Sequence, residues 1–363
     1  MTEIPPPPRR RRVMGLLASL PVLGRAGMAS AAPVPLVATP QDQVGFPDGA
    51  TMLVAGPSGG LMAHWCQTMQ PTLARSLAPG LRVRQEDVGG PDGVTGANEF
   101  DVRITPDGRT VLLTPGDAAI TWLVGDPRAK FDVAHWVPVM ACVTPAVVVA
   151  RASAFAAPGV IRVAATTPAG LQLPALLAIE MLGHQAQLVR VFQDERSLRE
   201  AFAQHAVDAV LLRGHHVPQH AAALAQAGAV PAFTFGAIDA LGRLVRCSQF
   251  PNVPNLPEFY AQRRGSSPGG PLFDAWCAAA IAAQLEFGMV LLTVTPADMV
   301  ALWRRAGVEA ARALQVAALA RSFAVQPIGG PEATATTAAL AVDVAALSSL
   351  RQWLLERFNW HPL

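Results

Sequence analysis

The feature that most constrains this chain is a repeated unit: a short apolar run, a loop of small residues, and then apolar residues at helical spacing. Residues 51–55 form one such run, residues 56–60 break it with three glycines, and apolar side chains then recur at helical spacing to residue 77. The same order returns between residues 160 and 182. Strands that alternate with helices in this way predict an α/β layer fold.

Further segments extend this alternation over most of the chain. Strands are predicted near 81–83, 111–114, 188–191, 209–212 and 232–235, with a glycine loop to Gly96 and helices near 118–124, 195–205, 219–226, 272–287, 297–322 and 343–357. Pro- and Gly-rich stretches at 251–257 and 265–271 mark a return crossing. We therefore expect two lobes, 50–140 plus 250–363 and 141–249, with the C-terminal helices packed on the first.

The N-terminus has the pattern of an export signal. Four arginines at 9–12 precede an apolar run at 13–23, and small residues at 29–31 provide a signal-peptidase site. The order Arg-Arg-x and two apolar residues also fits the twin-arginine motif. We therefore predict a twin-arginine-like signal peptide over 1–31, cleaved near Ala31, and an extended tether over 32–49, with a periplasmic mature protein.

Charge and composition exclude several classes of protein. Loss of the signal would remove five arginines and one glutamate and turn the formal charge of +2 into a negative one, which leaves no basic surface for nucleic acid. With Lys130 as the single lysine, no glycine loop ends in a phosphate-binding lysine, so Walker-type nucleotide enzymes are excluded. The four cysteines lack metal-ligand spacing, and we expect most to be buried thiols, with one disulfide as the alternative.

The loop Gly56-Pro57-Ser58-Gly59-Gly60 has two functional interpretations. It satisfies Gly-x-Ser-x-Gly between a strand and a helix, the context of a nucleophile elbow, so a secreted serine hydrolase using Ser58 is one hypothesis. Against it, the loop follows the first strand, and no oxyanion segment precedes it. The other interpretation is that Ser58, Gly59 and Gly60 offer backbone N–H groups at a helix N-terminus, where an anion binds without a cationic side chain. A plain tight turn is the structural alternative.

The histidines at 215–220 are a weaker candidate for a site. Pro218 interrupts the i, i+4 face that a helical metal pair needs, and no carboxylate or cysteine completes a ligand set nearby. The segment is interpreted as a surface turn, so no metal or cofactor is predicted.

Five motifs, in order over roughly residues 50–260, resemble those of the Bug-type solute-binding receptors of tripartite tricarboxylate transporters. Residues 55–63 are similar to that family's Pro-Phe-x-x-Gly-Gly-x-x-Asp loop, and Gly90, Gly93 and Gly96 are similar to its Gly-x-x-Gly-x-x-Gly loop. Residues 106–110 are similar to its Pro-Asp-Gly-Tyr-Thr, and residues 131–132 with 136–139 to its aromatic-Asp with Phe-x-Pro-Val. Residues 253–254 with 257–258 are similar to its Val-Pro-Thr-x-x-Glu. Each motif is short, but their order after an export signal favours the resemblance.

The sequence departs from the family pattern at two places. Ala63, with His64 beside it, stands where the family has an aspartate that reaches toward the ligand, and Ala55-Gly56 replaces Pro-Phe. The ligand can therefore differ from those of the family. No family motif is found beyond residue 270.

The resemblance implies a two-lobed, type II periplasmic-binding-protein-like α/β fold with a ligand cleft between the lobes. It implies capture of a small carboxylate without catalysis or cofactor, by a monomer that delivers it to the membrane subunits of a transporter or to a sensor. Ser58, Gly59 and Gly60 of one lobe would face Thr166, Thr167 and Gly170 of the other, with two helices opening at Leu61 and Leu171. Asp117, in the loop after strand 111–114, would stand at the mouth of the cleft.

Overall fold

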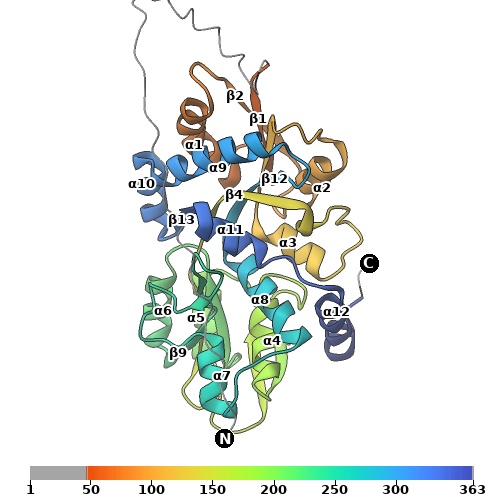
Figure 1. Ribbon diagram of the computed structural model, residues 1–363. Coiled ribbons are helices and arrows are strands. Elements are labelled where there is room, and N and C mark those ends of the chain that lie inside the picture. The colour runs from red at the N-terminus through yellow and green to blue at the C-terminus, as the bar shows by residue number, and fades with distance from the viewer. Residues whose placement is uncertain (1–45, 47, 362–363) are drawn as a thin grey trace, which may run out of the picture. The chain divides into compact units, whose positions relative to one another are not determined.

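The computed structural model describes residue 46 and residues 48–361. The predicted signal peptide, its twin-arginine motif and cleavage site, and nearly all of the predicted tether lie outside these residues. The described chain is of the α/β class, as predicted, and its strands form two main sheets (Figure 1). None of its described helices is both long enough and apolar enough to cross a lipid bilayer.

The first sheet has six strands in the order β13-β4-β12-β3-β1-β2. They are β1 (Ala50–Ala55), β2 (Val83–Val88), β3 (Thr110–Thr114), β4 (Trp136–Val143), β12 (Leu285–Leu292) and β13 (Gln326–Gly329). β1 pairs in parallel with β2 and β3, whereas β12 runs antiparallel to both β3 and β4. The carboxyl ends of β1, β2 and β3 therefore lie at one edge of this sheet.

The second sheet has five strands in the order β7-β6-β8-β5-β9. They are β5 (Ala146–Arg151), β6 (Val160–Ala164), β7 (Gln185–Val189), β8 (Ala209–Arg213) and β9 (Ala229–Thr234). β6 is parallel to β7 and β8, and β5 is antiparallel to β8 and β9. A short antiparallel ribbon of β10 (Ala237–Ile238) and β11 (Leu244–Val245) follows. The chain thus enters the second sheet after β4 and re-enters the first at β12; the lobe boundaries given above stay a prediction.

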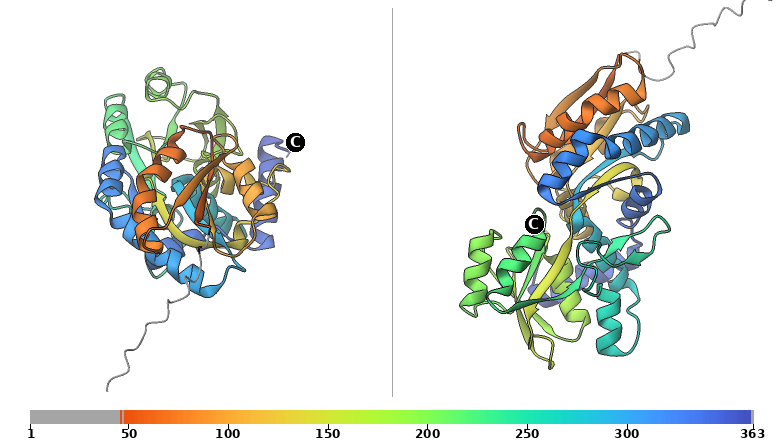
Figure 2. Two further views of the ribbon diagram at one scale, coloured as in Figure 1. Left: turned by 90° about the horizontal axis from the view of Figure 1, so that it is seen from above. Right: turned by 90° about the vertical axis from the view of Figure 1, so that its left-hand side faces the viewer.

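Twelve α-helices occur in the described residues: α1 (Leu61–Leu77), α2 (Val94–Arg103), α3 (Gly116–Leu123), α4 (Leu173–Met181), α5 (Glu195–Ala203), α6 (Val217–Ala225), α7 (Leu256–Arg264), α8 (Pro271–Gln284), α9 (Ala297–Arg312), α10 (Leu314–Phe323), α11 (Gly330–Ala338) and α12 (Val344–Phe358). α1, α9 and α10 gather on one side of the first sheet, and α2 and α3 lie on the other (Figures 1 and 2).

Both faces of the first sheet are buried at β1, β3 and β4, which explains why these strands are nearly continuous apolar runs. Along β1, Met52 and Val54 enter the core that contains Trp65 of α1 and Trp303 of α9. Leu53 and Ala55 point to the opposite face, into a core with Phe100 of α2 and Ala118 of α3. Side chains alternate between the faces of a strand, so helices on both faces require apolar residues at every position.

The helix predicted over 272–287 is wrong at its C-terminal end. α8 ends at Gln284, and the next eight residues form β12, all of them buried between β3 and β4. No Gly or Pro stands at the junction between Gln284 and Leu285 to mark the change, and periodicity cannot separate a buried strand from a buried helix. The helix predicted over 297–322 is likewise two helices, divided at Ala313, whose ψ of 137° is extended.

Several other elements escaped prediction. They are β4, β5, β10, β11, α2, α7, β13 and α11. The glycine loop predicted to reach Gly96 ends at Gly93, and Gly96 lies inside α2. Position 96 requires glycine because a Cβ there would meet the Cα of Ala55 at 2.6 Å. Close packing of α2 on β1 therefore overrides the low helix propensity of glycine.

The four cysteines are free thiols. Three of them are buried, Cys66, Cys142 and Cys247, which confirms the expectation for most of them. Burial raises the pKa of Cys66 to about 12, with a contribution from the nearby Asp87 carboxylate.

Candidate functional site

The loop between β1 and α1 leaves a helix N-terminus without a side-chain cap. Gly59 has a φ of +72°, which favours glycine, and Gly60 is the N-cap of α1 with extended backbone angles. No side chain caps α1, and its first turn has no acidic residue. The partial positive charge of this N-terminus is therefore not compensated by a carboxylate of its own helix.

Ser58 makes a contact that does not fit a nucleophile elbow. Its Oγ donates a hydrogen bond of 2.7 Å to Oδ2 of Asp87, at the end of β2, while Gln85 donates to Oδ1 of the same carboxylate. In the described chain, no histidine is hydrogen-bonded to this serine. Activation of a serine requires a base within hydrogen-bond reach that takes its proton, and a carboxylate held by two donors is a poor one.

A cavity of about 390 Å³ opens beside this helix N-terminus. Gly60, Leu61 and Met62 line it from the start of α1, and Asp117 lines it from α3. The remaining polar lining comes from Arg213 of β8 and Glu286 of β12. The cavity thus combines groups at the carboxyl edge of the first sheet with one side chain of the second, the place where α/β proteins bind ligands.

Arg213 is the last residue of β8 and is only partly exposed to solvent. Its Nε donates a 2.6 Å hydrogen bond to the carbonyl oxygen of Ala283, which orients the guanidinium. Within the described residues, its two terminal nitrogens have no hydrogen-bond partner and no carboxylate in salt-bridge contact. Burial lowers the pKa of Arg213, while the charges of Asp117 and Glu286 raise it. An arginine keeps its proton under these conditions, so a free two-pronged donor lines the cavity.

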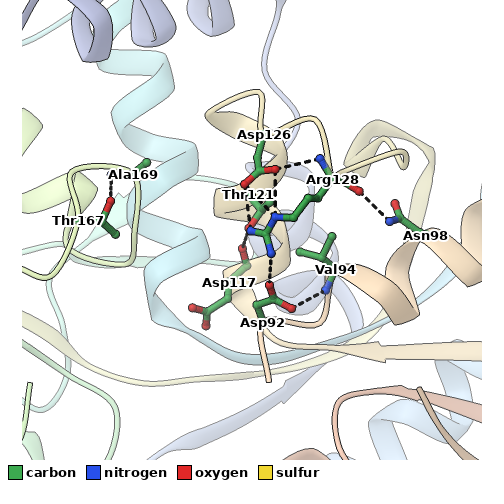
Figure 3. Close-up of polar contacts among 9 residues, drawn as sticks. All are labelled: Asp92, Val94, Asn98, Asp117, Thr121, Asp126, Arg128, Thr167 and Ala169. Atoms are coloured by element: carbon green, nitrogen blue, oxygen red, sulfur yellow. Dashed lines mark hydrogen bonds and ion pairs between the residues drawn. The ribbon is translucent and has the colours of Figure 1, made fainter. Parts of the chain in front are cut away.

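Asp117 lies in the first turn of α3, and not in the preceding loop as the sequence suggested. Its backbone carbonyl accepts a 2.9 Å hydrogen bond from Thr121 Oγ1. Figure 3 shows its carboxylate pointing away from the neighbouring group in which Arg128 joins Asp92 and Asp126. No side chain of the described residues donates a hydrogen bond to this carboxylate.

The surroundings of Asp117 shift its titration in two directions. Burial raises the pKa of the Asp117 carboxyl, and this is the largest cause; the charge of Arg213 and the residue's own backbone N–H lower it, and Asp92 raises it further. The net result is a raised pKa. The carboxylate is therefore incompletely compensated by the protein.

Glu286 has partners of its own in the protein and is 8% exposed. Its Oε1 lies 2.8 Å from Nε2 of His215 and accepts a 3.3 Å hydrogen bond from Nε1 of Trp65. His215 also stacks on Phe323 of α10, with ring centroids 4.2 Å apart. The segment that follows β8 is therefore joined to α1, β12 and α10.

The surface turn predicted at 215–220 holds for His216, which is exposed, but is wrong for His215, whose side chain is 28% exposed, and for residues 217–220, which form the first turn of α6. The pattern gave no sign of the distant partners that cover His215. Among the described residues, no group of three His, Cys, Asp or Glu side chains is arranged to hold a metal ion.

The loop predicted to face the ligand from the second lobe does not line this cavity. Thr166 is exposed, and Thr167 Oγ1 accepts a 3.4 Å hydrogen bond from the backbone N–H of Ala169 within the same loop. Figure 3 shows Thr167 on a separate segment from Asp117. The part of Thr166, Thr167 and Gly170 in binding stays a prediction.

Of the residues predicted from sequence, Gly60 and Asp117 line the cavity, and Ser58 and Gly59 lie in the loop just before Gly60. Sequence reasoning missed Arg213 and Glu286. A signal for Arg213 was present, because it directly follows the predicted strand at 209–212 and precedes Gly214. A charged residue at the carboxyl end of a buried strand in an α/β fold points to the ligand edge.

A second, smaller cavity of about 230 Å³ lies at the carboxyl edge of the second sheet. Its polar lining consists of Gln172, Gln193, Glu195, His215 and His220, together with Arg213. Arg213 therefore borders both cavities.

No protein-family model matches the chain, and no curated protein matches it. Among solved structures, a TctC solute-binding protein from Polaromonas aligns with a TM-score of 0.61 at 14% identity, over 86% of this chain and 99% of that one. The chain has the TctC fold. This is the two-lobed α/β architecture of type II solute-binding proteins, and it confirms the predicted fold class.

Two other solved structures align less closely. The periplasmic binding protein BugD has a TM-score of 0.45 at 15% identity, over 86% of this chain and 96% of that one. MatC from Rhodopseudomonas palustris, solved with bound malate, has a TM-score of 0.48 at 16% identity, over 85% of this chain and 99% of that one. The likeness to the TctC protein is the one that carries the assignment of the fold.

Proposed function

We propose that this chain is an extracytoplasmic solute-binding protein that captures a small carboxylate and delivers it to the membrane subunits of a tripartite tricarboxylate-type transporter. The observation that carries the proposal is Arg213, whose terminal guanidinium nitrogens are unpaired in the described protein and line the cavity. Hydrogen bonds between arginine and carboxylate are charge-assisted and often two-pronged. A partly buried arginine without a protein partner is accordingly suited to an anionic ligand.

The position of Arg213 also suggests how binding could be coupled to a change in shape. Arg213 belongs to the second sheet, whereas Gly60 and the start of α1 belong to the first, and both line the same cavity. A carboxylate held between the guanidinium and the N-terminus of α1 would stabilise the arrangement in which the two approach each other, because it binds that arrangement more tightly. Such a receptor needs no catalytic step.

The export signal predicted at residues 1–31 supports a periplasmic location. There a receptor of this fold would bind its ligand before it contacts a membrane partner. The TctC fold supports a transport role. The hydrolase alternative is not favoured, because the Ser58 hydroxyl is hydrogen-bonded to Asp87 instead of to a histidine.

The test is calorimetric titration of the protein with di- and tricarboxylates, aromatic acids and amino acids, after a thermal-shift screen of the same panel. Arg213→Met should weaken binding of the best ligand by about 100-fold, or about 2.7 kcal/mol, because two charge-assisted hydrogen bonds are lost. Arg243→Met is the matched control, since Arg243 is an exposed residue paired with Asp239 and does not line the cavity. Equal affinity in the two variants would refute Arg213 as the anchor.

A further inference from the structure

The charges around the cavity do not match those of a simple carboxylate receptor. One guanidinium, that of Arg213, shares the lining with two carboxylates, those of Asp117 and Glu286. The Glu286 carboxylate is occupied by His215 and Trp65. Asp117 has no such side-chain partner among the described residues, although it is only partly exposed. Among the described residues, the cavity lining therefore has one cationic and one anionic group without a side-chain partner.

Each class of ligand meets these two groups differently. The carboxylate of a monocarboxylic acid can pair with Arg213, but it then shares the one cation whose charge also acts on Asp117. The partly buried Asp117 carboxylate is left with less compensation, which is unfavourable in a site of reduced dielectric constant. A dicarboxylate brings a second negative charge toward Asp117 and Glu286, and like charges repel. A ligand that also carries an ammonium group can satisfy both.

The two free groups come from different sheets. Asp117 lies in the first turn of α3, beside the first sheet, and Arg213 ends β8 of the second. The apolar part of the cavity lining includes Leu61, Met62 and Leu285. An α-amino acid with a modest apolar side chain has three features that complement this lining: a carboxylate for Arg213, an ammonium for Asp117 and a nonpolar remainder for the apolar side chains.

We propose that the cavity selects an amino carboxylate, with Arg213 holding its carboxylate and Asp117 its ammonium group, in preference to di- and tricarboxylates. This inference rests on the function proposed above and specifies the ligand class of the same site. Asp117 is then the residue that determines specificity, and Arg213 is the residue that determines binding.

The experiment compares matched ligands by calorimetry on the full chain: L-leucine with 4-methylpentanoate, L-alanine with propionate, and L-aspartate with succinate. We expect each amino compound to bind at least tenfold more tightly than its partner without the amine. Asp117→Asn, which keeps the shape and removes the charge, should reduce this preference to less than threefold. Asp298→Asn is the control, because Asp298 occupies the first turn of α9 and is exposed.

The possible outcomes separate the two proposals. If the members of each pair bind equally, or if succinate binds best, and Arg213→Met loses binding of both, the ligand class is refuted and the carboxylate receptor stands. If Asp117→Asn retains the full preference for the amine, Asp117 does not hold the ammonium group, and the inference is wrong. If no carboxylate with or without an amine binds, both proposals fail.

Discussion

The carboxyl edges of the two sheets are built from similar units but contribute to the cavity in different ways. At the first sheet, β1 passes through a glycine loop directly into α1, and backbone and apolar groups at the start of that helix line the cavity. At the second sheet, the loop after β6 hydrogen-bonds to itself, and α4 begins only at Leu173. What the second sheet contributes to the cavity is the side chain of Arg213, two strands later in the sequence.

This difference shows that a strand–loop–helix unit is not by itself a ligand site. A Cβ on Gly60 would meet the carbonyl oxygen of Pro57 at 2.9 Å, so the tight backbone of the first loop demands glycine. A Cβ on Gly170 would meet the methyl group of Thr167, an atom of a side chain, at 2.8 Å. The two glycines look alike in the sequence, but only the first adjoins the cavity.

The largest effect that we expect is a loss of stability, and it should differ between the two edges because their glycines are packed differently. Gly116→Ala would place a Cβ 1.9 Å from the carbonyl oxygen of Ala282 in α8, so α3 and α8 must separate. The free energy of unfolding should fall by about 3 kcal/mol or more. Gly170→Ala should cost less than about 1 kcal/mol, because a side chain can rotate away. Urea unfolding measures both, and similar losses in the two variants would contradict this assignment.

The planar geometry of the Arg213 guanidinium should contribute to ligand affinity in addition to its charge. Arg213→Lys keeps the positive charge but replaces the planar fork with a single ammonium group. Affinity for the best carboxylate should fall about tenfold, or about 1.4 kcal/mol, which lies between the wild type and Arg213→Met. Calorimetric titration provides the values. A lysine variant as weak as the methionine variant would mean that the shape of the guanidinium dominates.

Gly59 allows the backbone of the first loop to be tested without a steric clash. Its φ is +72°, and no atom lies within 4 Å of the Cβ that an alanine would add. Gly59→Ala should therefore destabilise the protein by about 1 kcal/mol through backbone strain alone. Gly159→Ala is the control, since that position is also open but has no positive φ. A loss of stability in the control as large as in Gly59→Ala would show that strain is not the cause.

A smaller effect is expected from Asp117 on the ligand-free protein. Because its pKa is raised by burial, the folded state binds the proton more tightly than the unfolded state does, and the ionised carboxylate lowers stability at pH 7. Asp117→Asn should raise the melting temperature at pH 7. The gain should shrink as the pH falls through the raised pKa and should vanish below the unfolded value, near 3.8. A constant gain at all pH values would point to a cause other than charge.

The smallest effect is expected at the loop of the second sheet. Thr167→Val removes a hydroxyl that contacts only the backbone of its own loop, at 3.4 Å from the N–H of Ala169. Affinity for any ligand of the cavity should change less than twofold. A larger loss would restore the sequence-based prediction that this loop faces the ligand, and would move the site toward it.

The sequence predicted the α/β class and most strand–loop–helix units because period and glycine position are local signals. It placed the first loop correctly at the start of α1, and it named Asp117. It missed β12, which follows α8 with no Gly or Pro at the junction, because whether such a mostly apolar segment becomes a strand depends on the neighbours β3 and β4 that pair with it.

Local pattern by itself therefore determined the α/β class, most of the strand–loop–helix units and the position of the glycine loop before α1. Only the tertiary structure decided which of these segments line the cavity. Asp117, Arg213 and Glu286 are far apart in the sequence and belong to α3, β8 and β12. The sequence around any one of them therefore does not predict that the other two lie near it. The physical reason is that a charge is informative about binding only when its partners are known. In the described part of the chain, Glu286 has side-chain partners, whereas the Asp117 carboxylate and the fork of Arg213 have none.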